Sequence, residues 1–301
     1  MNLPTFICPG SQKSATTTLH DILIQHGDIY LPAEKEAHFF DMNDRYAMGL
    51  AWYESQYFSG WSGEEVVGEV TPKYMFLPEV PGRIFESIGS DVQFIFMLRN
   101  PVDRAYSHYW MRFGRGLETR SFEEAVTEEM VRLHETDTVD RRRLSTDAYL
   151  WRGFYAHQIS YFDQYFDTEK MLFIEFGKFV ANKSMEVDRV LEFLGLAPSP
   201  DIDLEKRSNV ARETRVPWLR QALSSGAARR LARAVVRSKT LRRKVSLAKN
   251  HVVSNVEDAL SEPVTKPPLS PELRQQLVDF FARANEELAA RTSLDLSTWS
   301  K

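Results

Sequence analysis

The sequence predicts an α/β fold in which helices flank a central parallel sheet and a phosphate-binding type of turn follows the first strand. Apolar runs of strand length alternate along the chain with segments of helical spacing. The strongest run, VQFIFML at residues 92–98, is apolar without alternation, which is typical of a parallel strand covered on both faces. The first strand leads into a turn of small and hydroxyl residues that opens a helix.

The expected elements follow in chain order. Residues 3–8 are a short apolar run ended by Pro9 and Gly10, which predicts a buried strand and a turn. Residues 16–26 have apolar side chains at helical spacing, and Gly27 is expected to end that helix. The remaining apolar runs predict strands at 65–70, 92–98 and 171–175 and helices at 101–115, which begins with Pro101, and at 270–291.

We expect a single domain over residues 1–301, because 301 residues with 43% apolar and 27% charged side chains are ample for one core. Residues 214–256 hold eleven Lys or Arg and no Asp or Glu. Apolar residues recur there about once per helical turn, which predicts an amphipathic basic helix or helix pair. This basic segment and the helix at 270–291, joined by a proline-rich linker, are expected to pack on the domain.

Composition narrows the function classes. The net charge of −4 argues against nucleic acid as a partner and against bulk attraction to anionic membranes. Cys8 is the one cysteine, so no internal disulfide forms, and its apolar surroundings favour a buried structural role. We find no targeting segment, no long apolar span and no cluster with metal-ligand spacing. A cytoplasmic, metal-independent protein is therefore expected.

The most informative stretch is PGSQKSATTTL at residues 9–19. Backbone N–H groups at a helix start converge on one point and carry the positive end of the helix dipole. Lys13 adds a full charge, and Ser14, Thr16 and Thr17 add hydroxyl donors. This pattern predicts a cradle for a phosphate group, and the alternative is a plain helix cap with a solvated lysine.

The turn is not a Walker A loop. Lys13 comes only three residues after Gly10, and no second glycine precedes it. The strand at 92–98 is followed by Arg99 rather than by an aspartate that would hold Mg²⁺. An arginine at the carboxyl end of a parallel strand lies where ligands bind and favours a second anion, and Ser107 lies about two helical turns further on. Two anion sites suit a nucleotide phosphorylated at both ends of its ribose.

Four ordered motifs carry a family resemblance. They are PGSQKSATTTL (9–19), KEAHFFD (35–41), GEVTPKY (68–74) and FIFMLRNPVDRAYSHYW (94–110). Together they resemble sulfotransferases that use 3′-phosphoadenosine 5′-phosphosulfate, and in particular bacterial members similar to the heparan-sulfate and other carbohydrate sulfotransferases. FLGL (193–196) and LDLSTW (294–299) resemble landmarks of the bacterial members. The resemblance covers nearly the whole chain.

The resemblance implies the P-loop-like sulfotransferase fold and transfer of a sulfuryl group to a hydroxyl of a carbohydrate, glycolipid or other small biosynthetic acceptor. Adenosine 3′,5′-bisphosphate is the implied product, and no metal is implied. Arg99 and Ser107 would hold the 3′-phosphate, and Lys13 would neutralise charge on the leaving phosphate. The 5′-phosphate loop would be Gly10, Ser11, Gln12, Lys13, Ser14, Ala15, Thr16 and Thr17, and a loop closing over the nucleotide would contribute Arg207, Asn209 and Arg212.

By the same resemblance, Glu36 would be the base that takes the proton of the acceptor hydroxyl. Its alternative is a solvated charge at a loop edge, and His38 and His108 are rival bases. The sequence departs from the pattern of this family at Val70, because many heparan-type relatives carry lysine at that position. Lys73 is near in sequence but lies beyond a proline.

Two other function classes stay open at this point. One is a P-loop-type kinase using ATP, and the other is a non-catalytic protein that binds a nucleotide or a membrane. The basic segment 214–256 could be a solvated face, a platform for an acidic acceptor or a peripheral membrane contact. The sequence leaves open the acceptor, the choice between O- and N-sulfation and the oligomeric state.

Overall fold

The structure is a computed structural model that describes residues 2–135, 148–199, 201–205, 212–214, 261–263 and 266–300. The chain divides into two compact units. The first consists of Met1–His108, Phe122–Asn209 and Leu269–Lys301, and the second of Tyr109–Ser121 and Val210–Pro268. The expected single domain stays a prediction. Apart from Thr214, the predicted basic segment 214–256 lies outside the described residues.

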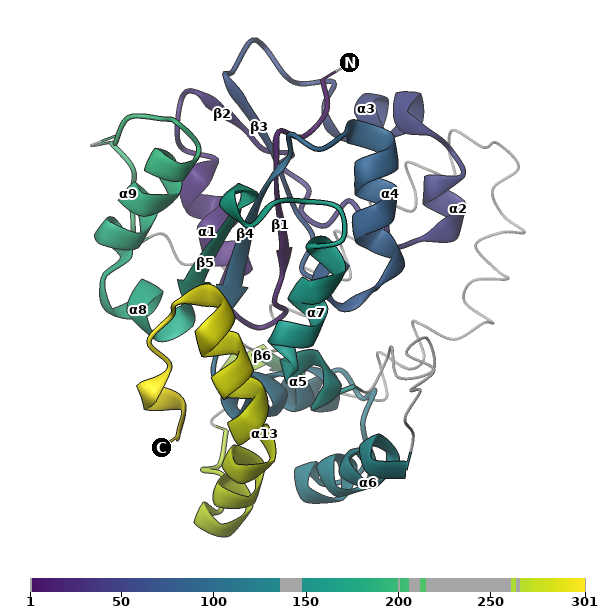
Figure 1. Ribbon diagram of the computed structural model, residues 1–301, viewed down its shortest axis with the longest axis vertical. Coiled ribbons are helices and arrows are strands. Elements are labelled where there is room, and N and C mark those ends of the chain that lie inside the picture. The colour runs from purple at the N-terminus through teal and green to yellow at the C-terminus, as the bar shows by residue number, and fades with distance from the viewer. Residues whose placement is uncertain are drawn as a thin grey trace. The chain divides into compact units, whose positions relative to one another are not determined.

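The first unit contains a five-stranded parallel sheet in the order β2-β3-β1-β4-β5 (Figure 1). This confirms the predicted central parallel sheet. The central strand β1 pairs with β3 on one side and β4 on the other, so the ends of these three strands lie together at one edge of the sheet. The strands are β1 (Phe6–Gly10), β2 (Ile29–Tyr30), β3 (Val66–Val70), β4 (Gln93–Leu98) and β5 (Met171–Glu175).

Helices cover both faces of this sheet, with α1 and α9 on one side and α4 and α7 on the other (Figure 1). The α-helices of the first unit are α1 (Thr16–Leu23), α2 (Asn43–Tyr46), α3 (Leu50–Tyr57), α4 (Glu79–Ile88), α6 (Phe122–Glu135), α7 (Tyr155–Phe162), α8 (Phe176–Ala181), α9 (Lys183–Phe193) and α13 (Pro271–Thr292). Helix α5 (Pro101–Gly114) begins in the first unit and runs into the second. The 3₁₀ turns are η1 (Tyr74–Phe76), η2 (Trp151–Gly153), η3 (Thr168–Lys170) and η4 (Ser297–Ser300), and β6 (Arg212–Thr214) pairs with β7 (Ser261–Pro263) in the second unit.

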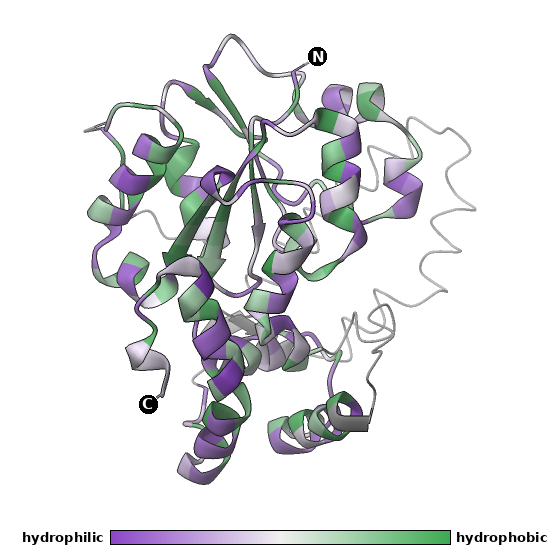
Figure 2. Ribbon diagram, in the orientation of Figure 1, coloured by the Kyte–Doolittle hydropathy of each residue, from purple (hydrophilic) through white to green (hydrophobic). Residues whose placement is uncertain are grey.

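The continuous apolar run of β4 is explained by these two covered faces. Phe94 and Phe96 pack into a cluster with Phe162 of α7, while Ile95 and Met97 pack into the cluster on the other face, with Leu191 of α9. Alternate residues of a strand point to opposite faces, so a strand covered twice is apolar at every position. In Figure 2 the strands of the sheet are coloured mainly as hydrophobic, whereas the helices alternate between hydrophobic and hydrophilic colours.

The predicted elements are present with small shifts at their ends. The strand at 171–175 has the predicted bounds, while the helix predicted at 16–26 ends at Leu23. The strand Ile29–Tyr30 was not predicted, because it has only two residues and therefore no periodic signal. The helices from α2 to α4 and from α6 to α9 were also not predicted.

Candidate active site

The turn after β1 is shaped by close packing and by left-handed backbone. A Cβ atom at Gly10 would lie 2.7 Å from the Cβ of Met75, so only glycine fits there without a shift. Lys13 and Ala15 have φ values of 74° and 64°. Ala15 directly precedes the first residue of α1, so the turn enters the helix through a left-handed residue.

Hydrogen bonds fasten this turn to the neighbouring strand β4. The backbone N–H of Ser11 donates to the Met97 carbonyl oxygen at 2.7 Å, and its hydroxyl lies 3.0 Å from the same oxygen. The Ser11 and Ser14 hydroxyl oxygens are 2.6 Å apart. The loop is therefore held at the carboxyl ends of both β1 and β4.

Arg99 lies directly after β4 and contacts the cradle. Its Nη1 donates to the Lys13 carbonyl oxygen at 3.1 Å, and its guanidinium carbon lies 4.4 Å from the centre of the Phe176 ring. Burial lowers the pKa of the Arg99 guanidinium. Among the residues that the structure describes, no carboxylate lies within salt-bridge distance of Arg99. The structure thus brings two predicted site residues, Lys13 and Arg99, together, and Ser107 is buried on the following helix α5.

Two further cationic side chains reach the cradle, and neither is among the site residues predicted from the sequence. Lys35 Nζ donates to the hydroxyls of Thr17 and Thr16, at 2.7 and 3.1 Å. Arg152 Nη1 donates to Gln12 Oε1 at 2.9 Å, and the guanidinium carbon lies 4.6 Å from the centre of the Phe76 ring. Neither contact has a local sequence signal, because the partners are far apart in the chain.

Arg152 is positioned by a buried carboxylate on α6. Glu129 accepts hydrogen bonds from the backbone N–H groups of Tyr149, Leu150 and Trp151, at 2.7–2.9 Å. Burial raises the pKa of Glu129, and these backbone donors oppose that rise. The segment that carries Arg152 is therefore anchored through its main chain.

A row of four charged side chains begins at Glu36. Its Oε2 lies 3.3 Å from His38 Nε2, and His38 Nδ1 lies 3.1 Å from the Asp41 carboxylate. Lys73 Nζ lies 3.0 Å from Asp41 Oδ2. Glu36 is exposed at the start of the row, while the Asp41 side chain is fully covered. The row alternates carboxylate and cation, so each member favours the charged form of the next.

The pKa directions in this row follow from these contacts. Hydrogen bonds to Asp41 and to Glu36 raise the pKa of His38 to about 9. Burial alone would raise the pKa of Asp41, but hydrogen bonds and charges from His38 and Lys73 outweigh it and lower that pKa. At neutral pH the row therefore holds an imidazolium between two carboxylates.

A second carboxylate, Glu69 near the end of β3, is buried and belongs to a structural hydrogen-bond cluster. It accepts hydrogen bonds from Tyr53 and, at 2.6 Å, from the Thr71 hydroxyl. Burial raises its pKa, and the hydroxyl donors oppose that rise. Tyr74 in turn accepts the backbone N–H of Phe39 at 2.9 Å. This cluster fastens the segment that carries Glu36 and His38 to the sheet.

The structure places the other predicted positions as follows. His108 is buried against the Tyr149 ring, as expected of a packed histidine. Val70 is buried in an apolar cluster of the sheet, so it supplies no charge. Arg207 and Asn209 lie outside the described residues, and Arg212 begins strand β6 in the second unit.

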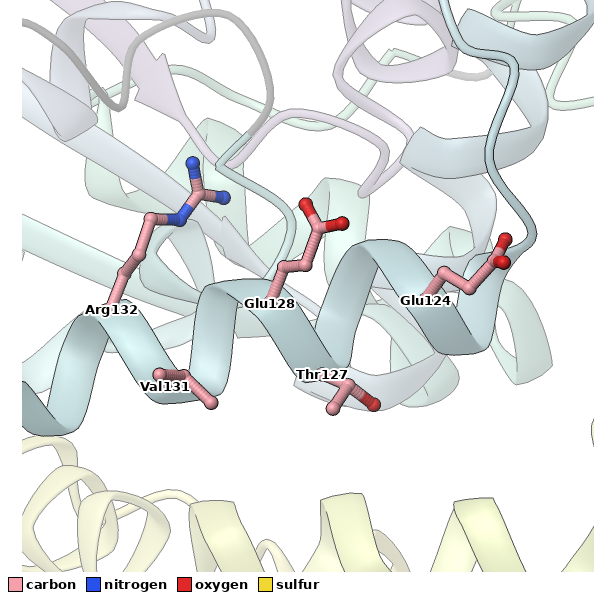
Figure 3. A pocket seen from close by; sticks show the side chains of 5 residues that line it. All are labelled: Glu124, Thr127, Glu128, Val131 and Arg132. Atoms are coloured by element: carbon pink, nitrogen blue, oxygen red, sulfur yellow. The ribbon is translucent and has the colours of Figure 1, made fainter.

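A surface cavity on α6 does not coincide with this chemistry. Its lining residues come from one helix: Glu124, Thr127, Glu128, Val131 and Arg132 (Figure 3). None of the predicted site residues lines it. In the part of the chain that the structure describes, we find no group of three acidic, histidine or cysteine side chains arranged to hold a metal ion. Within the same residues, no helix combines the length and apolar character that a membrane crossing requires.

Comparison with known proteins identifies relatives of the family that the sequence motifs resemble. The family description "Sulfotransferase domain" matches residues 4–214. The heparan sulfate glucosamine 3-O-sulfotransferase 3B1 of Mus musculus is 30% identical over 224 residues, which are 74% of this chain and 53% of that protein. The membrane-associated sulfotransferase kil1 of Dictyostelium discoideum is 33% identical over 135 residues, or 42% of this chain and 28% of that protein. This chain spans about half the length of the first of these relatives.

A solved structure agrees with the sequence relatives. The crystal structure of a sulfotransferase from Alicyclobacillus acidocaldarius matches with a TM-score of 0.68 and 25% identity, covering 100% of both chains. The predicted P-loop-like sulfotransferase fold is thereby confirmed.

Proposed function

This chain belongs to the sulfotransferase domain family, and we propose that it transfers a sulfuryl group from 3′-phosphoadenosine 5′-phosphosulfate to a hydroxyl of a carbohydrate or similar small acceptor. The second product is adenosine 3′,5′-bisphosphate. The observation that carries the proposal is the hydrogen bond from the Arg99 guanidinium to the Lys13 carbonyl oxygen, which links the arginine after β4 to the turn after β1 at one edge of the sheet. A donor with phosphates at both ends of its ribose needs two such adjoining sites.

The donor would be held by the turn after β1 and by the start of α5. Backbone N–H groups and the hydroxyls of Ser14, Thr16 and Thr17 face the 5′-phosphate, and Lys13 balances its charge. Arg99 and Ser107 take the 3′-phosphate, the arginine as a fork and the serine as a single donor. Arg207, Asn209 and Arg212 stay proposed contributors to the closing loop.

The reaction is an in-line displacement at sulfur. The acceptor oxygen forms a bond to sulfur while the bond between sulfur and the bridging oxygen of the 5′-phosphate breaks. The proton of the acceptor hydroxyl passes to the Glu36 carboxylate, and the electron pair of the broken bond remains on the phosphate beside Lys13. Positioning and charge stabilisation supply the rate enhancement, as in phosphoryl transfer.

Glu36 suits the role of base because it is exposed and its oxygen is held by His38. His38 is itself held on its other nitrogen by Asp41. A positively charged His38 is a poor base, so the pKa of about 9 favours Glu36 over His38 in this role. His38 is then a positioning residue.

The acceptor class rests on the relatives. Several of them are named as heparan sulfate glucosamine 3-O-sulfotransferases, which supports a carbohydrate hydroxyl as the acceptor. A cytoplasmic location and a peripheral membrane contact of the basic segment remain proposals of the sequence alone.

Titration calorimetry tests the reaction class. We expect purified protein treated with a chelator to bind adenosine 3′,5′-bisphosphate at least tenfold more tightly than AMP, because AMP lacks the 3′-phosphate. Transfer of labelled sulfuryl groups onto glucosamine-containing oligosaccharides would then identify the acceptor. A preference for ATP with Mg²⁺ would instead indicate a kinase, and binding of the bisphosphate with no transfer to any acceptor would favour a non-catalytic protein.

A further inference from the structure

We propose that Lys35 is a donor-site residue that contacts the 5′-phosphate end of the nucleotide together with Thr16 and Thr17. The inference rests on the proposed function and deepens it. Lys35 comes from the segment between β2 and α2, whereas the cradle itself is the turn after β1. The cradle would therefore be built from two separate parts of the chain.

The geometry carries the proposal. Lys35 Nζ lies 2.7 Å from Thr17 Oγ1 and 3.1 Å from Thr16 Oγ1. An ammonium group has three N–H donors, so these two hydroxyls use two of them. The third N–H has no hydrogen-bond partner among the residues that the structure describes. It is available to an anion that enters the cradle.

The same contacts set the direction of the hydroxyl hydrogens. A threonine oxygen that accepts from an ammonium group still has its own O–H to donate. Because Lys35 occupies the lone pairs on one side, the Thr16 and Thr17 hydrogens turn away from it. Both hydroxyls then act as donors toward a negatively charged ligand, which is the polarity that a phosphate requires.

Electrostatics favours the same conclusion. Lys35 is half-buried, and its direct contacts in the described part of the chain are neutral hydroxyls. Burial lowers the pKa of the Lys35 ammonium, and the charge of Glu36 is the largest influence that opposes this shift. A partly desolvated cation whose hydrogen-bond partners are neutral gains more from an anion than a solvated lysine does. A phosphate beside Lys35 would therefore be bound strongly.

Titration with two nucleotides distinguishes a donor-binding role of Lys35 from a purely structural role. We would titrate wild type, Lys35→Met and Lys35→Gln with adenosine 3′,5′-bisphosphate and with adenosine 3′-monophosphate, which lacks the 5′-phosphate. Both variants are expected to bind the bisphosphate at least tenfold more weakly and the monophosphate within twofold of wild type. Lys35→Gln keeps N–H donors for the threonine hydroxyls, so it retains the local structure while removing the charge.

Lys170→Met is the control, because Lys170 lies in η3 with its side chain 39% exposed. It is expected to bind both ligands as wild type does. Equal losses for both ligands in the Lys35 variants, or unchanged bisphosphate binding, would overturn the inference. The wild-type titration distinguishes this failure from failure of the proposed function: a wild type that binds the two ligands equally contradicts the 5′-phosphate cradle itself.

Discussion

At the scale of residues, the charged side chains around Glu36 depend on their immediate neighbours for their charge state. Glu36 faces an imidazolium, and that imidazolium is held in turn by Asp41, which Lys73 also contacts. Each of these contacts favours ionised forms at neutral pH. Glu36, the proposed base, thus lies beside a cationic side chain two residues further along the chain.

The proposed role of Glu36 predicts a loss of turnover without a loss of donor binding. Glu36→Gln keeps the size of the side chain but cannot take a proton, so sulfuryl transfer is expected to fall by about 10²–10⁴-fold. Affinity for adenosine 3′,5′-bisphosphate, measured by calorimetry, should stay within twofold. Glu34→Gln, at an exposed neighbouring position, is the matched control and should change neither quantity. A Glu36→Gln variant with full turnover would rule out this base.

The contacts of His38 predict a pH dependence of stability. Its pKa in the folded protein, about 9, lies above the ordinary value of 6.5. The protonated ring therefore stabilises the fold fully below about pH 6.5, and this contribution is lost as pH rises through 9. Urea unfolding should show that His38→Gln costs most at pH 6 and least at pH 10. A cost that is independent of pH would contradict the ion pairs.

At the scale of elements, the C-terminal turn η4 closes the same edge of the sheet that carries Arg99. Trp299 is 2% exposed, and its Nε1 donates to Glu175 Oε1 at 3.0 Å. Its carbonyl oxygen accepts from Asn100 Nδ2 at 3.3 Å. The final turn therefore links the ends of β4 and β5, which gives LDLSTW a structural role.

This link predicts a large stability loss when the indole is removed. Trp299→Ala is expected to lower the free energy of unfolding by ~3–5 kcal/mol, because it leaves a cavity and removes the donor to Glu175. Trp299→Phe keeps most of the ring and loses the N–H, so a smaller cost of about 1–3 kcal/mol is expected. Urea denaturation followed by circular dichroism measures both. Equal, small costs would show that the turn is not anchored.

At the scale of the molecule, the first unit brings together the residues of the proposed site from separate parts of the chain. The cradle follows β1, the charged row lies between β2 and α2 with Lys73 after β3, and Arg99 follows β4. Because parallel strands all end at one edge, these pieces meet without any being near in sequence. A ligand that bridges them holds several segments of the folded chain at once.

A nucleotide that contacts several segments of the folded chain is predicted to stabilise the fold. A ligand that binds only the folded state at 100 times its dissociation constant adds about 2.7 kcal/mol to the free energy of unfolding. Adenosine 3′,5′-bisphosphate should raise the thermal midpoint accordingly, with or without EDTA. Lys13→Ala is expected to keep the midpoint of the free protein within a few degrees but to lose most of the ligand-induced rise. A shift that is the same in wild type and Lys13→Ala would contradict the cradle.

Local patterns were enough to predict much of this protein. The buried strands at 65–70, 92–98 and 171–175, the turn from Gly10 to Thr17 and the arginine after β4 are each readable within a few residues, because burial and helix starts leave local signals. What only the tertiary structure decided are the contacts of Lys35 with the threonines, Arg152 with Gln12 and Lys73 with Asp41. These pairs join segments that are far apart in the sequence, so their existence depends on strand order and on the path of the connecting chain. A charged side chain in a loop has no periodicity, and its partner becomes known only when the fold brings the two together.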